Sequence, residues 1–174
     1  MTTERFGLIQ TGGKDATVIG DDIQVGQKAP EFTVQALDWS VVQGISDTQG
    51  KVRVIAAVPS LDTDTCDRET RRFNQAAADL DEDIVIIVIS TDLPYAQKRW
   101  CGAAGVDQVM VLSDHMTVEF GEKYACLIKE RRTLRRAVFV VDRQDKVTYV
   151  AYMPALGIEP DYEEVLEAAR AALT

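Results

Sequence analysis

Hydrophobic and polar positions along the chain predict short strands first, then alternating strands and helices. The N-terminal part has brief apolar stretches separated by turns at Gly12–Gly13 and Gly20–Asp22, a pattern typical of hairpins. From Val52 onward the apolar runs become nearly continuous, as expected for strands that are covered on both faces. The predicted strands are 16–19, 32–37, 52–58, 84–89, 109–112, 137–141 and 147–152.

Apolar residues at helical spacing lie between these strands and after the last one. They predict helices at 66–80, at 116–124, near the C-terminus and from an opening at Asp92–Pro94 to Cys101. We expect an α/β fold with a mostly parallel central sheet, an antiparallel edge pair, helices on both faces and an N-terminal β extension. A thioredoxin-like architecture fits this order, and other small α/β folds fit the same periodicity.

The composition is that of one ordinary globular domain. The chain has 174 residues, 46% of them hydrophobic and 27% charged, so we expect a single domain spanning 1–174 that needs no structural metal. A formal net charge of −9 disfavours nucleic acid and anionic membranes as partners. Because the sequence shows neither a bilayer-spanning run nor the apolar core of a secretory signal, we expect a cytoplasmic protein.

The three cysteines form no C-x-x-C pair, so neither a zinc knuckle nor a vicinal dithiol is indicated. An arbitrary cysteine of this kind is usually a small buried residue. Cys66 differs because it follows a buried strand and a polar loop and enters the first turn of a helix, where backbone N–H groups and the helix dipole favour a thiolate. Thr63 can direct its hydroxyl to the same place. The acidic residues between 62 and 69 would oppose a thiolate if they faced it. Arg68, Arg71 and Arg72 can offset them, and a cation brought from elsewhere in the fold would matter more.

The spacing Pro59-x-x-x-Thr63-x-x-Cys66 resembles the peroxidatic-cysteine signature of peroxiredoxins. The stretch 60–74 resembles the thiol peroxidase branch of that family. So does 90–101, the segment in which that branch keeps its resolving cysteine. Because further matches extend the resemblance over essentially the whole chain, it is much more specific than one short motif; they lie at 12–14, 25–32, 136–142 and 159–162.

The resemblance implies a role for five residues. Cys66 would be the peroxidatic nucleophile, and Thr63 would hydrogen-bond its sulfur and the peroxide. Arg136 would hold the thiolate and polarise the O–O bond, while Pro59 would shield the sulfur from solvent. Cys101 would be the resolving thiol of an atypical two-cysteine peroxiredoxin with an intrachain disulfide.

The same resemblance implies the reaction and its partners. The chain would reduce hydrogen peroxide and alkyl hydroperoxides without a bound cofactor or metal, would be re-reduced by thioredoxin, and would form a homodimer. Disulfide geometry would require the cysteine-bearing helices to unwind locally between oxidation states. Leu61 and Tyr152 are apolar residues that the family would place near the peroxide channel, which favours organic hydroperoxides as substrates. Thr65 and Asp67 depart from the usual residues of the branch and add a hydroxyl and a negative charge beside the nucleophile.

Two other functions fit the residues. A cysteine hydrolase or transferase would use Cys66 with His115 as base and Asp114 as the orienting group, although two adjacent residues cannot readily make that contact. A thioredoxin-fold binding protein would show no turnover. A single histidine does not complete a usual metal set with these cysteines. Cys126 is expected to be a buried packing residue.

Overall fold

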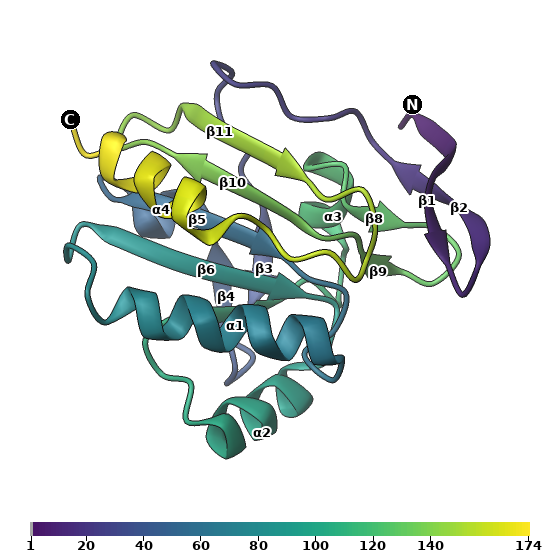
Figure 1. Cartoon of the computed structure of the whole chain (residues 1–174), viewed down its shortest axis with the longest axis horizontal. Coiled ribbons are helices and arrows are strands. Elements are labelled where there is room, and N and C mark those ends of the chain that lie inside the picture. The colour runs from purple at the N-terminus through teal and green to yellow at the C-terminus, as the bar shows by residue number, and fades with distance from the viewer. Residues whose placement is uncertain (1) are drawn as a thin grey trace.

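The strands of the chain form two sheets (Figure 1). A computed structural model describes residues 2–174. The larger sheet has the strand order β11-β10-β5-β6-β7-β3-β4. Its strands are β3 (Thr33–Gln35), β4 (Val41–Gln43), β5 (Val52–Ala57), β6 (Ile84–Ser90), β7 (Met110–Ser113), β10 (Ala137–Val141) and β11 (Val147–Tyr152). The smaller sheet, in the order β1-β2-β8-β9, consists of β1 (Glu4–Thr11), β2 (Lys14–Ile19), β8 (Leu127–Ile128) and β9 (Thr133–Leu134).

The central sheet is mixed, so the prediction of a mostly parallel sheet is wrong in this respect. Parallel pairing is confined to β5, β6 and β7, and the other four strands join antiparallel. After β7 the chain forms α3 (Glu119–Lys123), β8 and β9 near the carboxyl ends of the parallel strands. Strand β10 therefore begins at that end, with Ala137 opposite Ala57, and runs back beside β5. The expected antiparallel pair of β10 and β11 is confirmed.

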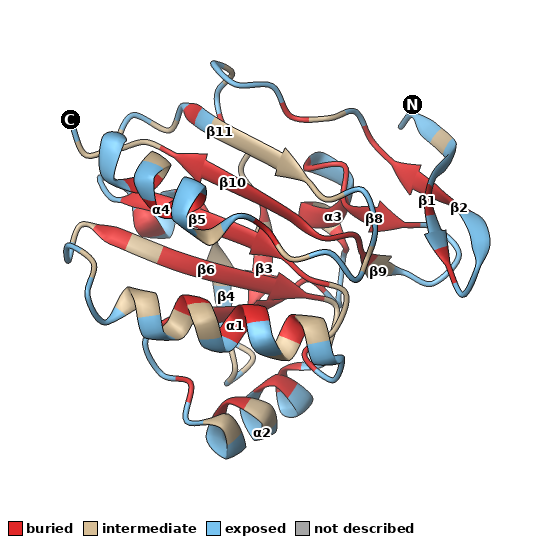
Figure 2. Ribbon diagram, in the orientation of Figure 1, coloured by how far each residue is buried: buried red, intermediate tan, exposed pale blue. Residues whose placement is uncertain are grey.

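Helices cover both faces of the central sheet, as predicted. On one face lie α1 (Asp64–Ala77), α2 (Pro94–Ala104) and α4 (Tyr162–Ala171), and on the other lie α3 and a 3-10 turn at Ser46–Thr48. The inward stripes of these helices are buried and their outer surfaces are exposed (Figure 2). Within residues 2–174, each helix lacks the length and apolar character that crossing a bilayer would demand.

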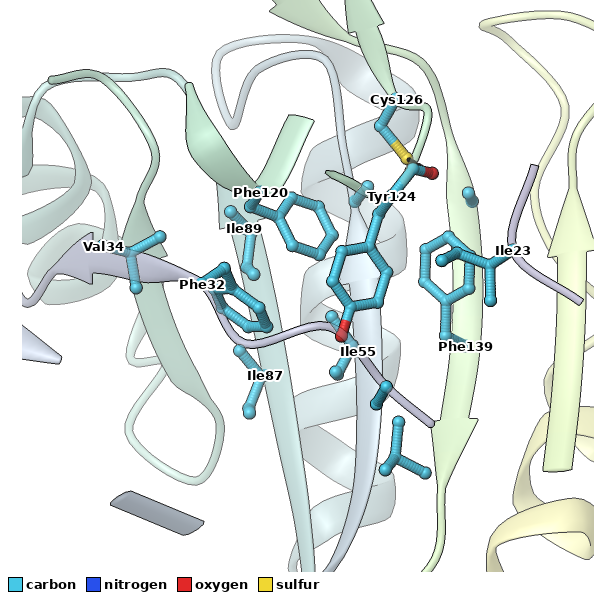
Figure 3. Close-up of a cluster of buried hydrophobic side chains, with 14 of the residues drawn as sticks. Ile23, Phe32, Val34, Ile55, Ile87, Ile89, Phe120, Tyr124, Cys126 and Phe139 are labelled. Carbon is cyan, nitrogen blue, oxygen red and sulfur yellow. Dashed lines mark hydrogen bonds between the residues drawn. The ribbon is translucent and has the colours of Figure 1, made fainter. Parts of the chain in front are cut away.

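An aromatic cluster fills the face of the sheet opposite α1 (Figure 3). Phe120 and Tyr124 stack on each other and both contact Phe32 and Phe139, with ring centroids between 4.6 and 6.4 Å apart. Cys126 lies in the same cluster and is fully buried, as expected for a packing residue. Burial raises the pKa of the Cys126 thiol to about 12, so this thiol stays protonated and shielded in the folded chain.

The predicted N-terminal β extension is the hairpin of β1 and β2, which turns at Gly12–Gly13. Asp22 follows this hairpin and accepts charged hydrogen bonds from Arg5 at 2.7 Å and Arg135 at 2.6 Å. Arg135 is buried and directly precedes Arg136 at the start of β10. The extension is thereby fastened to the end of the central sheet at which the candidate site residues lie.

Candidate active site

Cys66 occupies the first turn of α1, after the loop that follows β5, as the sequence predicts. Its side chain is fully buried, and its Sγ lies 3.1 Å from Nη2 of Arg136 and 3.5 Å from the backbone N of Ser60. A guanidinium and a backbone N–H thus donate to one sulfur at a helix N-terminus. These contacts stabilise negative charge on sulfur, as a nucleophilic cysteine needs.

Arg136 is held in place on every side of its guanidinium. Nη1 forms a buried salt bridge with Glu69, and Nε and Nη2 donate to the carbonyl of Leu156 at 3.1 and 2.9 Å. Burial raises the pKa of Glu69 to about 7, because its effect outweighs the opposite effect of the nearby Arg136 charge. Since all these contacts are made at once, the guanidinium cannot turn away from Cys66 without leaving a buried charge unpaired.

Sequence reasoning missed Glu69, although one signal was present. Glu69 lies three residues after Cys66, on the same inward face of α1 as Thr70 and Phe73, all of them buried. An acidic residue at a core position of an amphipathic helix requires a cationic partner. The sequence therefore indicated that an arginine would approach this face of the helix, without indicating which one.

An open cavity of about 530 Å³ leads to this site. Its lining consists of Pro59, Ser60, Thr63, Asp64, Thr65, Arg131, Thr133, Arg136, Leu156 and Gly157. The residues expected near a peroxide channel, Leu61 and Tyr152, are absent from this lining. Leu61 is buried in the core under α1, and Tyr152 donates a hydrogen bond to the carbonyl of Tyr124 on the opposite face of the sheet. Leu156 and Pro59 supply apolar surface to the cavity instead.

The remaining predicted site residues are Pro59, Thr63 and Cys101. Pro59 is half-buried and Thr63 exposed, and both line the cavity. The Thr63 hydroxyl donates to the carbonyl of Ser60 at 2.8 Å and makes no hydrogen bond to Cys66. Cys101 is buried in α2, in the same apolar cluster as Cys66, and burial raises the pKa of its thiol. All three cysteines are free thiols.

Comparison with known proteins agrees with this geometry. The redoxin family profile matches residues 24–166. The sequence is 50% identical over 161 residues to a thiol peroxidase from Halalkalibacterium halodurans, an alignment covering 92% of this chain and 96% of that protein. It is 54% identical over 150 residues to a thiol peroxidase from Oceanobacillus iheyensis, covering 86% and 90%. The chain belongs to the thiol peroxidase branch of the redoxin family.

The likeness extends to solved structures. A peroxiredoxin-like protein from Aquifex aeolicus superposes with a TM-score of 0.85 at 37% identity, covering 99% of both chains. The predicted thioredoxin-like fold and the resemblance to peroxiredoxins are therefore confirmed. On the same findings, this protein is a thiol-dependent peroxidase.

The hydrolase alternative finds no support in the site of this thiol peroxidase. Asp114 is buried, and its carboxylate accepts hydrogen bonds from the backbone N–H groups of Phe120 at 3.1 Å and Gly121 at 2.8 Å. His115 is exposed, and its imidazole forms no hydrogen bond to the residues that the structure describes. Asp114 therefore holds the start of α3 and does not orient His115. Within 2–174, no three His, Cys, Asp or Glu side chains group as a metal site.

Asp92 of the peroxidase fastens the loop before α1 to the start of α2. Its carboxylate accepts hydrogen bonds from the Ser60 hydroxyl at 2.7 Å, the Leu61 backbone N–H at 2.9 Å and the Ser90 hydroxyl at 2.7 Å. The helix expected to open at Asp92–Pro94 begins at Pro94, and its N-cap is Leu93, which makes no side-chain cap bond, so Asp92 does not cap α2. Asp92 instead positions the loop that carries Ser60, whose backbone N–H donates to the Cys66 sulfur.

Replacing Asp92 by asparagine is expected to loosen that loop. The amide keeps the shape of the side chain but loses the negative charge, and its NH2 group replaces one of the two oxygens that accept these hydrogen bonds. We expect a loss of about 1–3 kcal/mol in the free energy of unfolding and a roughly tenfold slower reaction with peroxide. Urea denaturation and stopped-flow kinetics measure both. Asp79→Asn, at an exposed residue whose side chain forms no hydrogen bond within 2–174, is the matched control. Equal behaviour of the two variants would contradict this role.

Proposed function

We propose that this peroxidase works by a two-cysteine cycle in which Cys66 reacts with the peroxide and Cys101 resolves the product. The observation that carries the proposal is the 3.1 Å contact between Arg136 and the buried Cys66 sulfur at the inner end of an open cavity. The fixed guanidinium stabilises the thiolate. The same cation can stabilise the negative charge that develops on the leaving oxygen.

In the first step the Cys66 thiolate attacks the nearer oxygen of the hydroperoxide. An S–O bond forms as the O–O bond breaks, and the leaving oxygen takes a proton and departs as water or an alcohol. The sulfur is oxidised to a sulfenic acid and the peroxide is reduced. The Thr63 hydroxyl already donates to Ser60, so its oxygen is free to accept the proton of the peroxide. Pro59 narrows the cavity and limits the access of water.

In the second step the Cys101 sulfur attacks the sulfenic sulfur, so that an S–S bond forms and water leaves. Since burial raises the pKa of Cys101, this thiol is protonated while α2 stays closed. Resolution therefore requires a local opening that removes Cys66 from Arg136 and hydrates Cys101. Thioredoxin, an external dithiol, then restores both thiols by exchange.

The substrates and the setting are part of the proposal. Hydrogen peroxide and alkyl hydroperoxides both suit a cavity that combines hydroxyl and charged side chains with the apolar side chains of Pro59 and Leu156. A homodimer would cover exposed apolar side chains near α2, among them Leu93 and Tyr95. The cycle depends on a reducing compartment, so we place the protein in the cytoplasm.

The variant Cys101→Ser tests the cycle. We expect it to consume about one peroxide per chain and then to stop with a sulfenic acid on Cys66. Turnover with thioredoxin should fall by at least about a hundredfold, because the disulfide that thioredoxin reduces is missing. Mass spectrometry after one equivalent of peroxide, together with a thioredoxin-coupled assay, measures both.

The control is Cys126→Ala, which removes a thiol that is buried away from the cavity. This variant should still form a disulfide between Cys66 and Cys101. Wild-type turnover by Cys101→Ser would contradict the resolving role. A linked peptide that contains Cys126 would contradict the assigned pair.

A further inference from the structure

A side-chain hydrogen bond joins the two cysteine-bearing helices directly beside both cysteines. Oδ1 of Asp67 accepts from the indole Nε1 of Trp100 at 2.9 Å. Asp67 follows Cys66 in α1, and Trp100 precedes Cys101 in α2. Both side chains are half-buried, so the bond is partly protected from water. Each partner of this hydrogen bond is the direct chain neighbour of a cysteine. A displacement of Cys66 relative to Cys101 therefore also displaces Asp67 relative to Trp100.

Arg71 reinforces the contact. Its Nε donates to the second carboxylate oxygen of Asp67 at 2.8 Å, and its guanidinium carbon lies 5.7 Å from the centroid of the Trp100 ring. Its Nη1 also reaches the carbonyl of Ala104 at 3.4 Å. The two oxygens of Asp67 thus have different partners, and the indole is held in one orientation. The contact is therefore an ordered part of the reduced structure.

The contact opposes the movement that disulfide formation needs. In the reduced state the Cys66 sulfur is bound to Arg136 and Ser60, and Cys101 is buried in α2. A disulfide requires the first sulfur to leave those donors and the second to become accessible to it. Because residues 67 and 100 move with the adjacent cysteines, their hydrogen bond stabilises the state in which the sulfur stays beside Arg136.

We propose that the Asp67–Trp100 hydrogen bond is a latch that sets the rate of disulfide formation after Cys66 has been oxidised. This inference rests on the two-cysteine function proposed above. While the latch is closed, the sulfenic acid remains open to a second hydroperoxide. In that side reaction another S–O bond forms, the O–O bond breaks, an alcohol or water leaves, and the sulfur becomes a sulfinic acid. The latch therefore sets the share of chains lost to overoxidation.

The variant Trp100→Phe tests the latch, since it removes the indole donor and keeps an aromatic ring. We expect disulfide formation to become about three- to tenfold faster, the range for a partly exposed hydrogen bond to a charged group. The first reaction of Cys66 with peroxide should stay within roughly twofold of wild type, because Arg136 and Ser60 are untouched. The ratio of sulfinic acid to disulfide at a given peroxide concentration should fall by the same factor as disulfide formation rises. Rapid-quench mass spectrometry measures these rates separately. A general loss of stability would not accelerate disulfide formation while leaving the first reaction with peroxide unchanged.

The chain offers a matched control and a second variant. Trp39→Phe makes the same change in a ring that also packs on α2, with its centroid 5.1 Å from that of Tyr95. Its Nε1 is buried and has no hydrogen-bond partner within the described residues, so no hydrogen bond to α1 is lost and all three readouts should equal wild type. Asp67→Ala removes the acceptor and should also accelerate disulfide formation. The double variant should be no faster than the faster single variant, because one contact is lost in both.

Two results would overturn the inference at different levels. If Trp100→Phe and Asp67→Ala both form the Cys66–Cys101 disulfide at the wild-type rate, the latch is wrong and the two-cysteine cycle stands. If the wild-type chain forms no such disulfide after peroxide treatment, the cycle itself is wrong and the latch falls with it. The first experiment is therefore the wild-type time course.

Discussion

Replacing Cys66 by serine will abolish peroxide reduction, with a loss of at least about 10⁴-fold in the rate constant. The hydroxyl of serine stays protonated beside Arg136, and its oxygen cannot be oxidised to the counterpart of a sulfenic acid. Substrate binding in the cavity should persist, because its lining is unchanged. The measurement is peroxide consumption under an excess of dithiol, compared with buffer alone.

Cys126→Ala is again the control for this experiment. It removes a thiol of similar burial on the other side of the sheet, and its activity should stay within roughly twofold of wild type. Circular dichroism would verify that both variants are folded. If Cys66→Ser retained a tenth of the wild-type rate, another residue would be the nucleophile and the proposed cycle would be wrong.

The second large effect is expected for Arg136→Lys. The lysine ammonium keeps the charge, but it cannot contact the Cys66 sulfur, Glu69 and the Leu156 carbonyl together, as the guanidinium does. We expect sulfenic acid formation to slow by about 10²–10³-fold, the usual cost of removing one donor from a site of developing negative charge. Stopped-flow measurement of the second-order rate constant, with no resolving step involved, gives this value.

Arg135→Lys separates chemistry from stability. Arg135 is also buried, donates to Asp22 at 2.6 Å and lies over the Tyr152 ring at 3.9 Å, but it makes no contact with Cys66. Both variants should lose about 1–3 kcal/mol in the free energy of unfolding. Only Arg136→Lys should react slowly with peroxide. A wild-type rate constant for Arg136→Lys would mean that positive charge alone activates the thiol, without the simultaneous contacts that the guanidinium makes.

The central strands and long helices could be predicted because each contains enough residues to show a recognisable pattern of hydrophobic positions. The runs at 52–58 and 84–89 and the stripe from Cys66 to Leu80 correspond to β5, β6 and α1 within a few residues. The strands β4, β8 and β9 span two or three residues, too few for alternation to be visible. Strand direction was predicted wrongly because it depends on where the chain re-enters the sheet, which no local pattern records.

The candidate site shows the same division between local and long-range information. The place of Cys66 in a first helical turn follows from local sequence. The contact with Arg136 joins residues seventy positions apart, and only the resemblance to peroxiredoxins indicated it. Taken alone, the basic cluster 131–136 indicated a solvated surface. Burial of Arg135 and Arg136 depends on Asp22 and Glu69, partners that only the folded chain brings to them.

The burial of Cys126 limits how many electrons the chain can store. With one thiol enclosed in the aromatic cluster, two remain for the proposed cycle, and together they release two electrons to one peroxide molecule. An oxidised chain has no further reserve until a dithiol reaches it. In a sudden exposure, the amount of protein present therefore sets how much peroxide is removed at once. Under a steady supply of peroxide, the delivery of reducing equivalents sets the rate.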